Sequence, residues 1–348
     1  MIHFFPLFDK NAADTAYGEA IRAIGVEHRI FANRVNFGHN SRLELIFVAL
    51  PRLAVVAMRS AWRSLVQAQP APDVVVVVSD IEVLIFAFAK FVMRRRTRIV
   101  HNTFIYTTRP NRWVEALRRR YYRFVLGHAQ MAVVHSRVEI ARNRKLFPGL
   151  ATEFVFVPYG LTVDMRDIYR AEPRRPGQFP DLPLLVAAGR SGRDYATLFA
   201  AMQGLDAELL VICDFEGAVP PVPEGAKIRV AHNIYSHEFF RALHDADVVV
   251  LPLSNLEISA GQTVLIQAKA LGCPLVVTDT PTSRDYVQAD VDAVTVPPGD
   301  PEALRAAIRA LLADPARAKA LGDAAAASFD RNHGTQGFLT RLVEAVTK

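Results

Sequence analysis

Residues 259–274, SAGQTVLIQAKALGCP, are of types that suit phosphate binding. Gly261 ends an irregular stretch, and residues 262–271 read as a helix that stops at the Gly-Cys-Pro step. A helix N-terminus presents unpaired N–H groups and about half a positive charge, so phosphate binds there readily. Thr263 adds a hydroxyl donor, and Gln267 lies on the same helix face. The alternative is an ordinary loop whose glycine serves only the turn.

A second segment, AAGRSGRDYATL at 187–198, directly follows an apolar run that reads as a buried strand. In a Rossmann-like domain the loop after such a strand lies at the carboxyl edge of the sheet, where ligands bind. Arg190 and Arg193 can hold a diphosphate with planar, permanently charged guanidinium groups, and Asp194 is a candidate for the start of a helix. No Gly-Lys-Ser/Thr follows, so this is not a P-loop, and a solvated basic loop is the alternative.

Apolar strand-like runs alternate with amphipathic helical patterns, which is typical of α/β folds with buried parallel strands. We expect strands at 2–7, 73–78, 98–102, 131–135, 154–158, 184–188, 208–213, 227–230, 248–252, 275–278 and 293–296. Residues 172–183, EPRRPGQFPDLP, interrupt this pattern with four prolines and form the expected interdomain linker. A chain of 348 residues suits two such domains. Asp300 and Asp314 each precede a proline and are expected to cap two short helices.

Positive charge is concentrated in one part of the first half. Residues 90–145 contain fifteen lysines and arginines against two acids, whereas the whole chain has a formal net charge of +6. Within that stretch, residues 113–124 read as a helix with arginines flanking an apolar stripe of Trp113, Leu117, Tyr121 and Phe124. Clustered arginines with aromatic residues suit an anionic lipid surface, so we predict peripheral membrane attachment. The alternative is that the stripe packs on the sheet while the arginines are solvated.

Composition disfavours several other classes of protein. Cys213 and Cys273 lie in or beside apolar strand patterns, so we expect no disulfide framework and a reducing, cytoplasmic setting. The apolar stretches at 43–58 and 83–93 fall short of the roughly 18 to 20 residues of a spanning helix. The ten histidines form no metal-binding motif, so no metal site is predicted. A nucleic-acid partner is not predicted either, because the basic segment lacks the aromatic platform of the usual modules.

Both candidate segments resemble the nucleotide-sugar domain of retaining GT-B glycosyltransferases, particularly those of family four, or group 1. Arg190 matches the arginine of the family's diphosphate-binding Gly-Arg step, and Arg193 stands where the family has a lysine. QAKALGCPLVVTD is similar to the family's A-x-G-x-P-V-V run, and DYVQADVDAVTVPPGDPEAL resembles its strand-to-helix passage. The resemblance spans most of residues 184–321.

The sequence departs from the family where the family has two glutamates eight positions apart. Gln267 occupies the second glutamate position and Ser259 the first. Gln267 can still hydrogen-bond ribose hydroxyls, whereas Ser259 cannot replace a carboxylate that orients the donor sugar, and Glu257 is the candidate substitute. Gly261, Thr263 and both arginines are retained, which is typical of a variant site rather than a decayed one.

The first half resembles the acceptor domain of the same enzymes more loosely. PDVVVVVSD and TRIVHNT are similar to two consecutive family strands, and His101 matches a histidine that faces the donor sugar. By itself, a histidine at a strand end is more often structural. AQMAVVHSRVEI and VPYGLTVD also resemble family segments, which places Ser136, Tyr159 and Gly160 near the interdomain cleft. DKNAADTAYG replaces the usual glycine pair of the first loop and keeps Gly18 alone.

The resemblance implies an α/β protein of the GT-B fold, with two Rossmann-like domains facing across a cleft. The expected parts are an acceptor-side domain at 1–171, the linker at 172–183, a nucleotide-sugar domain at 184–336, and a terminal helix at 337–348 packing back toward the first domain. The implied reaction transfers a sugar, expected to be a hexose, from a nucleoside diphosphate sugar with retention and without a further cofactor. The implied donor-binding residues are Arg190, Arg193, Ser259, Gly261, Gln262, Thr263 and Gln267, and the implied catalytic residues are His101, Glu257, Arg190 and Arg193.

Two alternatives use the same donor domain. A GT-B sugar-nucleotide epimerase would need carboxylates and histidines converging on the sugar, and this site is poor in carboxylates. A sugar-nucleotide-binding protein without turnover is suggested by the missing glutamate pair. The donor base, the sugar and the acceptor are left open by the sequence. The basic segment favours a lipid-linked or cell-envelope glycan, as in polysaccharide biosynthesis, reached from the inner face of the cell membrane.

Overall fold

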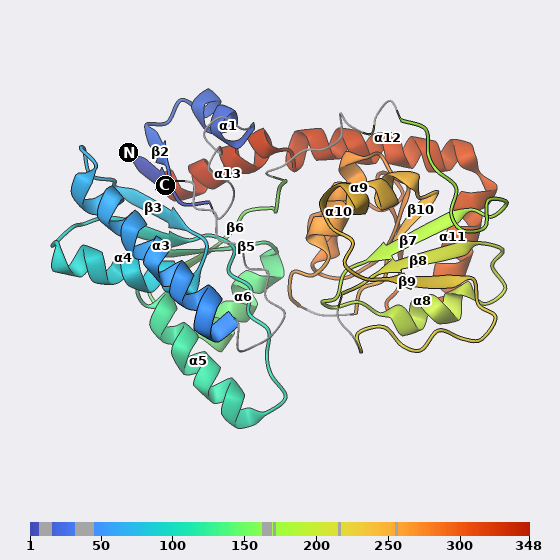
Figure 1. The fold of residues 1–348 in the computed structure, drawn as a ribbon, viewed down its shortest axis with the longest axis horizontal. Coiled ribbons are helices and arrows are strands. Elements are labelled where there is room, and N and C mark those ends of the chain that lie inside the picture. Colours follow the sequence, from blue (N-terminus) through green and yellow to red (C-terminus); the bar gives the residue numbers. More distant parts are fainter. Residues whose placement is uncertain (7–15, 32–44, 162–168, 170–171, 215–216, 255–256) are drawn as a thin grey trace. The chain divides into compact units, whose positions relative to one another are not determined.

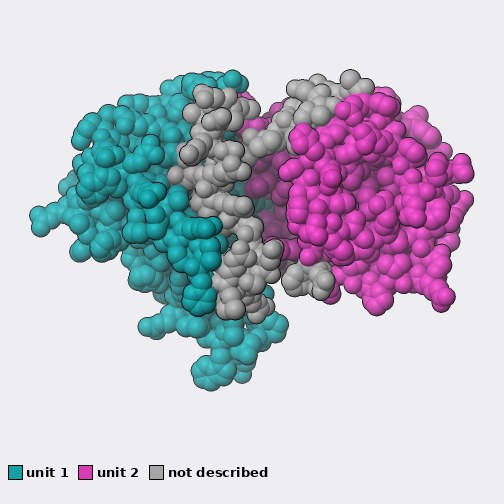
Figure 2. All heavy atoms as spheres, viewed as in Figure 1, with its two compact units in different colours: residues 1–157, 339–348 teal, residues 158–338 magenta. Residues whose placement is uncertain are grey.

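The structure is a computed structural model, and it describes the chain except residues 7–15, 32–44, 162–168, 170–171, 215–216 and 255–256. The chain divides into two compact units (Figure 2). Unit 1 comprises residues 1–157 and 339–348, and unit 2 comprises residues 158–338. The chain therefore leaves unit 1 once and returns to it at the end. The proline-rich segment 172–183 lies within unit 2.

Unit 1 is built on a parallel six-stranded sheet with the order β2-β1-β3-β4-β5-β6 (Figure 1). The strands are β1 (Ile2–Phe4), β2 (His28–Ile30), β3 (Val74–Val77), β4 (Arg98–His101), β5 (Met131–Val134) and β6 (Glu153–Phe156). β3 and β5 are runs of buried apolar residues, as expected for parallel strands covered on both faces. β2 and β3 pair with opposite edges of β1, so the strand order reverses at β1.

The helices of unit 1 connect these strands. They are α1 (Ala16–Ile24), α3 (Leu50–Trp62), α4 (Asp80–Val92), α5 (Arg112–Leu126) and α6 (Arg137–Leu146), with π-helical turns at Leu45–Ala49 and Arg63–Gln67 beside α3. A capping box begins α4, because Ser79 Oγ accepts from Glu82 N while the Glu82 carboxylate accepts from Ser79 N. Asn111 Oδ1 caps α5 by accepting from two backbone amides of its first turn.

Unit 2 repeats the plan with a sheet of order β12-β11-β10-β7-β8-β9. The strands are β7 (Leu184–Ala188), β8 (Glu208–Ile212), β9 (Ile228–Ala231), β10 (Val248–Leu251), β11 (Leu275–Thr278) and β12 (Val294–Val296). Alternate residues of β7 enter different cores, since Leu184 and Val186 pack in one cluster and Leu185 and Ala187 in the other. β8 and β10 pair with opposite edges of β7, so the strand order reverses between β7 and β10.

The helices of unit 2 cover both faces of this sheet (Figure 1). They are α8 (Tyr195–Met202), α9 (Ser236–Asp245), α10 (Gln262–Ala270), α11 (Pro301–Ala313) and α12 (Pro315–Asn332), with a 3-10 turn at Ser283–Asp285, and α13 (Thr335–Thr347) follows α12. Asp300 and Asp314 cap α11 and α12 with a proline in the first turn, as the Asp-Pro steps predict. α12 has 18 residues and is longer than expected. α13 begins in unit 2 and ends in unit 1.

A buried ion pair holds α10 in place. Lys269 is fully buried, and its Nζ donates to Asp292 Oδ2 at 2.8 Å, to Tyr286 O at 2.7 Å and to Ser328 Oγ at 3.1 Å. Three acceptors satisfy all three ammonium donors, which makes this cation tolerable in the core. Helix α10 is thereby tied to three other segments of unit 2.

The α/β fold class expected from the sequence is confirmed, and apart from the first strand, every expected strand lies within two residues of the observed one at each end. The expected strand at 2–7 ends at Phe4. β2 is not apparent from the sequence, because two of its three residues, HRI, are polar and none of the three is buried. Cys213 and Cys273 are both buried, and neither forms a disulfide. In the described part of the chain, no helix is long and apolar enough to cross a membrane. The roles expected for the two domains stay predictions.

Candidate functional site

The two loops singled out by the sequence lie at neighbouring strand ends of the unit 2 sheet. Residues 189–194 follow β7, while residues 252–254 and 257–261 belong to the loop that follows β10. β7 and β10 are paired, and the strand order reverses between them. Ligands of open parallel sheets bind at such a switch point, because the flanking loops diverge and leave a crevice at the carboxyl edge.

The Arg193 side chain packs between these two loops. Its Nε and Nη1 each donate at 2.8 Å, to the carbonyl oxygens of Ala188 and Ser191. A Cβ on Gly189 would lie 2.3 Å from Nη2, and one on Gly261 would lie 3.3 Å from Nη1. Gly189 also has a φ of 106°, so any other residue there would be strained and would displace the guanidinium. The loop after β7 and the loop before α10 therefore both pack against the Arg193 guanidinium.

Backbone hydrogen bonds hold the two loops together. Asp194 N donates to Pro252 O at 3.0 Å, and Ser254 N donates to Gly192 O at 3.1 Å. The Asp194 carboxylate caps α8 by accepting from the amide and the hydroxyl of Thr197. This carboxylate is therefore engaged at the helix start and does not serve as counter-ion to the neighbouring guanidinium.

The Arg193 guanidinium is partly buried and forms no ion pair within the described residues. Burial lowers the pKa of Arg193, although an arginine keeps its charge near neutrality. Arg190 is exposed three residues earlier in the same loop. A desolvated cation without a carboxylate is unfavourable unless an anion is supplied. The loop is therefore arranged for a negatively charged ligand.

Helix α10 contributes its N-terminus to the same place. Its N-cap residue is Gly261, which has a φ of 90° and provides no side-chain cap, so the first amides of the helix have no acceptor from a capping side chain. Gln262 is buried, Thr263 is exposed and Gln267 is partly buried. Gln267 Oε1 has no hydrogen-bond partner within the described residues. This oxygen can accept from a ribose hydroxyl.

Tyr159 joins the site from the first residues of unit 2. Its hydroxyl is hydrogen-bonded to the Thr263 side chain, and burial raises the pKa of this hydroxyl. Its backbone N–H donates to Tyr286 Oη at 2.9 Å. The neighbouring Gly160 is required by packing, because a Cβ there would lie 2.3 Å from Phe338 Cβ. The contact between Tyr159 and Thr263 arises from the fold, so no spacing in the sequence indicates it.

Ser259 and Glu257 precede Gly261 on the same loop but differ in exposure. Ser259 is buried, whereas Glu257 is exposed. The structure thus provides a solvent-facing carboxylate near the position where the family has a glutamate, and its role as a substitute stays a prediction. In the first loop of unit 1, residues 9–15 of DKNAADTAYG lie outside the described residues.

Two polar residues beyond β8 and β9 lie at the same sheet edge and are not apparent from the sequence motifs. Asp214 Oδ1 accepts from Asn233 N at 2.6 Å. Tyr235 is 58% exposed, and its hydrogen bond with Asp214 raises the pKa of its hydroxyl. An exposed aromatic ring beside a carboxylate suits a nucleoside, because the ring can stack on a base while the carboxylate accepts hydrogen bonds. Asp214 and Tyr235 both follow strands that the sequence predicts, and this position at a strand end could have indicated them as candidate site residues.

In unit 1, His101 is the buried last residue of β4. Its Nε2 donates to Asp80 Oδ1 at 3.0 Å, and its Nδ1 has no partner within the described residues. The ring packs edge-on against Phe104 at 5.6 Å between centroids. Asp80 fixes the orientation of the imidazole, and the remaining nitrogen, Nδ1, is buried. Contact of His101 with the donor sugar stays a prediction.

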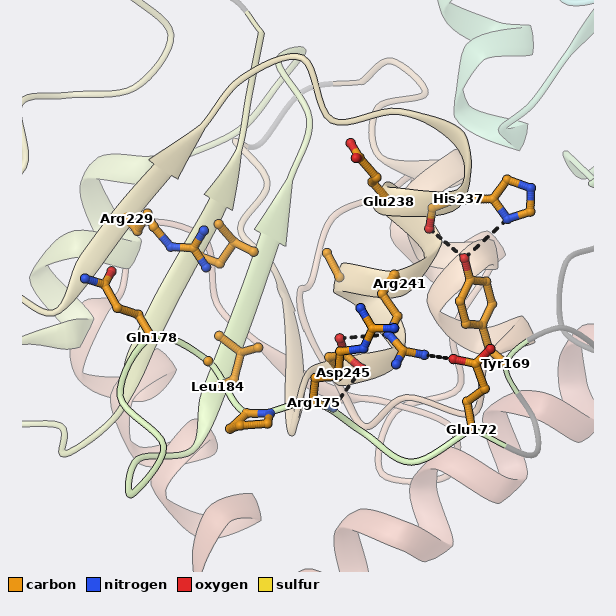
Figure 3. Close-up of a pocket in the computed structure, with 14 residues that line it drawn as sticks. Tyr169, Glu172, Arg175, Gln178, Leu184, Arg229, His237, Glu238, Arg241 and Asp245 are labelled. Carbon is orange, nitrogen blue, oxygen red and sulfur yellow. Dashed lines mark hydrogen bonds and ion pairs between the residues drawn. The ribbon is translucent and has the colours of Figure 1, made fainter.

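A cavity of about 760 Å³ lies elsewhere in unit 2, alongside α9 (Figure 3). Arg241 in its wall is paired with Glu172 and, at 3.2 Å, with Asp245, and its guanidinium lies over the Tyr169 ring. This cation is therefore already neutralised. Leu184, at the amino end of β7, also lines the cavity, so the cavity does not coincide with the loops at the carboxyl edge. We regard it as separate from the candidate donor site.

Helix α5 exposes the stripe predicted from the sequence. Trp113 is 87% exposed, Leu117 70%, Phe124 58% and Tyr121 40%. The alternative in which this stripe packs on the sheet is therefore wrong. Arg118 lies over the rings of Tyr106 and Tyr122 and donates to Thr107 O, so it stabilises the local fold. An exposed apolar stripe of this kind marks a surface for a partner or a membrane.

No group of three or more histidine, cysteine, aspartate or glutamate side chains in the described ranges is arranged to hold a metal ion. The positive charge that the structure places at the carboxyl edge of unit 2 comes instead from two arginines and a helix N-terminus. Such an arrangement can stabilise the negative charge of a diphosphate.

The protein has two open parallel sheets, each flanked by helices, and the candidate ligand-binding loops lie at the carboxyl edge of the second sheet. This arrangement defines the GT-B class of fold, and comparison with solved structures confirms the class. Sucrose-phosphate synthase from Thermosynechococcus elongatus matches with a TM-score of 0.65 and 18% identity, over 99% of this chain and 98% of that chain. Anabaena Alr3699/HepE in complex with UDP-glucose matches with a TM-score of 0.65 and 12% identity, over 99% of each chain. A structure described as "Trehalose-6-phosphate from E. coli bound with UDP-2-fluoro glucose" matches with a TM-score of 0.65 and 12% identity, over 100% of this chain and 99% of that chain.

The particular group within that class is indicated by the sequence. The model of the family described as "Glycosyl transferases group 1" matches residues 196–314, which include the α10 loop and helix. The expected resemblance to group 1 glycosyltransferases is thereby confirmed, and sugar transfer is supported as the class of activity. No curated protein matches the sequence.

Proposed function

We propose that the protein transfers a hexose from a nucleoside diphosphate sugar bound at the carboxyl edge of the unit 2 sheet. The observation that carries this proposal is the unneutralised Arg193 guanidinium between the glycine loops that follow β7 and β10. A diphosphate supplies the negative charge that this position lacks. The switch point of the sheet, the α10 N-terminus and the family match at 196–314 support the same ligand.

Each candidate residue has a role that its position supports. Arg190, Arg193 and the first amides of α10 contact the diphosphate and stabilise the charge that develops on it as the sugar leaves. Thr263 donates to a phosphate oxygen, and Gln267 Oε1 accepts from the ribose. Ser259 and Gln262 shape the loop and the helix start that present these groups.

His101 and Glu257 are proposed to contact the transferred sugar. Retention of anomeric configuration follows from the resemblance to group 1 enzymes, and the anomer formed in a proton NMR assay is its test. An epimerase is not favoured, because Glu257 is the one carboxylate proposed to contact the sugar, while Asp214 lies beside Tyr235, where a nucleoside would bind. The Anabaena and E. coli structures are described with UDP-glucose and UDP-2-fluoro glucose, so UDP-glucose is the first donor to test.

Calorimetric titration with UDP tests the donor site. Arg190→Ala should weaken UDP binding by about tenfold to a hundredfold, because a charge-assisted contact to phosphate contributes about 1.5 to 3 kcal/mol. Arg190 is exposed, so the fold should be unaffected. Arg309→Ala removes an exposed arginine of α11 and should leave the affinity unchanged. Equal affinity of the wild type and Arg190→Ala would contradict the assigned diphosphate site.

We further propose that the acceptor is lipid-linked and that unit 1 attaches to an anionic membrane surface. The exposed α5 stripe supports attachment, since Trp113 and Leu117 are largely solvent-exposed beside arginines. Arg112 and Arg120 are exposed on the same helix and add attraction to anionic lipid. A transferase held at the surface meets a lipid-linked acceptor in two dimensions, which raises its effective concentration.

Vesicle flotation tests the attachment. Trp113→Ala with Leu117→Ala should lower binding to anionic vesicles at least about tenfold, because each large apolar side chain contributes about 1.5 to 3 kcal/mol on burial. The unfolding free energy should change little, because both side chains are exposed. Val222→Ala with Val291→Ala, exposed apolar residues of unit 2, is the matched control. Equal flotation of all three proteins would contradict attachment through α5.

A further inference from the structure

Unit 1 has a pocket that the donor site does not use. It is open, has a volume of about 800 Å³, and lies between the C-terminal ends of α4 and α5. Lys90, Arg94 and Arg95 line it together with His128 and Gln130. No acidic side chain contributes to this lining in the part of the chain that the structure describes.

The three cations of this pocket are not neutralised by other described residues. Lys90, Arg94 and Arg95 form no ion pair and no side-chain hydrogen bond with any of them. Lys90 is partly buried, and burial lowers the pKa of its ammonium group. The C-terminal ends of two helices supply about half a negative charge each, against three positive side chains. Roughly two positive charges therefore remain without a counter-charge.

The remaining polar groups of the pocket are also arranged as donors. Gln130 Oε1 accepts from Ile99 N at 2.8 Å, which leaves the amide NH₂ of Gln130 to donate. His128 Nδ1 donates to Phe124 O at 2.7 Å, so protonation of Nε2 adds another donor. A phosphate group presents acceptor oxygens and negative charge, and it is the ligand that this set of donors fits.

The surroundings of the pocket are apolar and exposed. Phe91 and Val92, in its wall, and Phe88 are exposed on α4, Phe91 to 81%. On the α5 side, the Phe124 ring packs against His128 at 4.7 Å between centroids, so the exposed α5 stripe continues to the pocket. A free phosphate ion would leave these aromatic side chains in water, whereas a lipid bilayer would bury them.

We propose that this pocket binds the phosphate group of an anionic membrane lipid while Phe88, Phe91 and Phe124 enter the interface around it. The proposal rests on the membrane attachment proposed above and specifies its contact. It predicts that the protein discriminates between lipids by the accessibility of their phosphate and not by surface charge alone.

Flotation with charge-matched vesicles tests this contact. One set contains phosphatidic acid in phosphatidylcholine, and the other contains phosphatidylserine at a proportion that gives the same surface potential. The wild type should bind the phosphatidic acid vesicles at least about fivefold more tightly, a factor that corresponds to about 1 kcal/mol in total. Arg94→Gln with Arg95→Gln should abolish this preference. Arg144→Gln with Lys145→Gln removes the same charge from exposed positions on α6 and should retain it.

The outcomes separate the pocket from the attachment. Equal binding of the wild type to both charged vesicles overturns the pocket while leaving the attachment in place. Failure to bind either vesicle overturns the attachment and the lipid contact together. Titration with inorganic phosphate distinguishes the source of the ligand, because tight binding in solution without lipid preference would assign the pocket to a free anion and overturn the lipid proposal. All four substituted residues belong to unit 1, so unchanged hydrogen exchange of unit 1 amides shows that both variants are folded.

Discussion

Unit 1 and unit 2 share a plan of parallel strands and covering helices, yet they leave positive charge in different places. In unit 2 the unneutralised guanidinium of Arg193 lies between two loops at the carboxyl ends of central strands. In unit 1 the unneutralised cations line a pocket between the C-terminal ends of α4 and α5, beside exposed aromatic rings. We propose a diphosphate for the first position and an anionic lipid surface for the second. Under this proposal, the location of the uncompensated charge, and not the fold, distinguishes the functions of the two units.

The helices that carry the two regions are also held differently. α10 is tied down by the buried pair of Lys269 and Asp292, whereas α5 turns Trp113 and Leu117 toward solvent. A donor site must hold its helix N-terminus in register with the neighbouring loop, while an interfacial helix must keep one face uncovered. Substitutions should therefore affect stability in one region and attachment in the other.

The largest effect is expected from Lys269→Met. It leaves the buried Asp292 without its ion-pair partner and should lower the unfolding free energy of unit 2 by about 3 to 5 kcal/mol. Urea unfolding followed by hydrogen exchange of unit 2 amides measures this loss. Lys227→Met breaks an exposed pair with Asp206 and should cost at most about 1 kcal/mol. Similar losses for the two variants would remove the distinction between the anchored helix and the rest of the unit.

Acid should weaken unit 1 through a buried histidine. Burial lowers the pKa of His135 to about 4. In the unfolded chain a histidine binds its proton near pH 6.5, so this contribution is fully present above that pH and is lost as the pH falls toward 4. The expected loss is about 3 kcal/mol, and His3, whose pKa burial also lowers to about 4, acts in the same direction.

His135→Gln isolates this contribution. The variant should be less stable than the wild type near neutrality, because the contacts with Val157 O and Thr103 Oγ1 change. Its unfolding free energy should nevertheless fall less steeply between pH 6.5 and 4. Hydrogen exchange at several pH values, read for unit 1 amides, gives both slopes, and parallel slopes would show that His135 is not the titrating group.

Gly189→Ala should affect donor binding with a modest effect on folding. The added Cβ would lie 2.3 Å from Arg193 Nη2 and should displace the guanidinium, weakening UDP binding by about tenfold, or roughly 1.4 kcal/mol. Gly204→Ala is the matched control, because Gly204 also has a positive φ and a Cβ there would meet no atom within 4 Å. If Gly189→Ala and Gly204→Ala weaken UDP binding equally, the loss of affinity is explained by backbone strain and not by displacement of the Arg193 guanidinium.

The smallest effect is expected from metal chelation. Arg190, Arg193 and the α10 N-terminus supply positive charge where the diphosphate is proposed to bind, so donor hydrolysis or transfer should persist in excess EDTA. A radiometric or coupled UDP-release assay measures this. Complete loss of activity, restored by magnesium or manganese, would show that these groups do not suffice for the diphosphate.

The sequence predicts the unit 2 strands well because buried parallel strands are continuous apolar runs such as VVVL in β10. The edge strand β2, with residues HRI, lacks this signal. The loop at 190–193 and the helix predicted after Gly261 are also found where the sequence places them, because the same apolar runs fix the ends of the preceding strands.

Other features depend on neighbours that the sequence does not reveal. Asp80 meets His101, and Tyr159 meets Thr263, through the order of the strands and the path of the chain. The α5 stripe has the periodicity of a core-facing helix, and periodicity alone does not specify whether anything covers it. The structure answers this, since Trp113 is almost fully exposed.

The path of α13 has a consequence for the order in which the protein is made. Residues 339–348 complete unit 1, where Arg98 Nη2 donates to Val346 O at 2.6 Å and Leu342 is fully buried, yet they follow all of unit 2 in the chain. A ribosome therefore releases every residue of unit 2 before the last segment of unit 1 emerges. During synthesis unit 2 can therefore complete its core first. The apolar core of unit 1 stays incomplete until the final turns of α13, which carry Leu342, have been made.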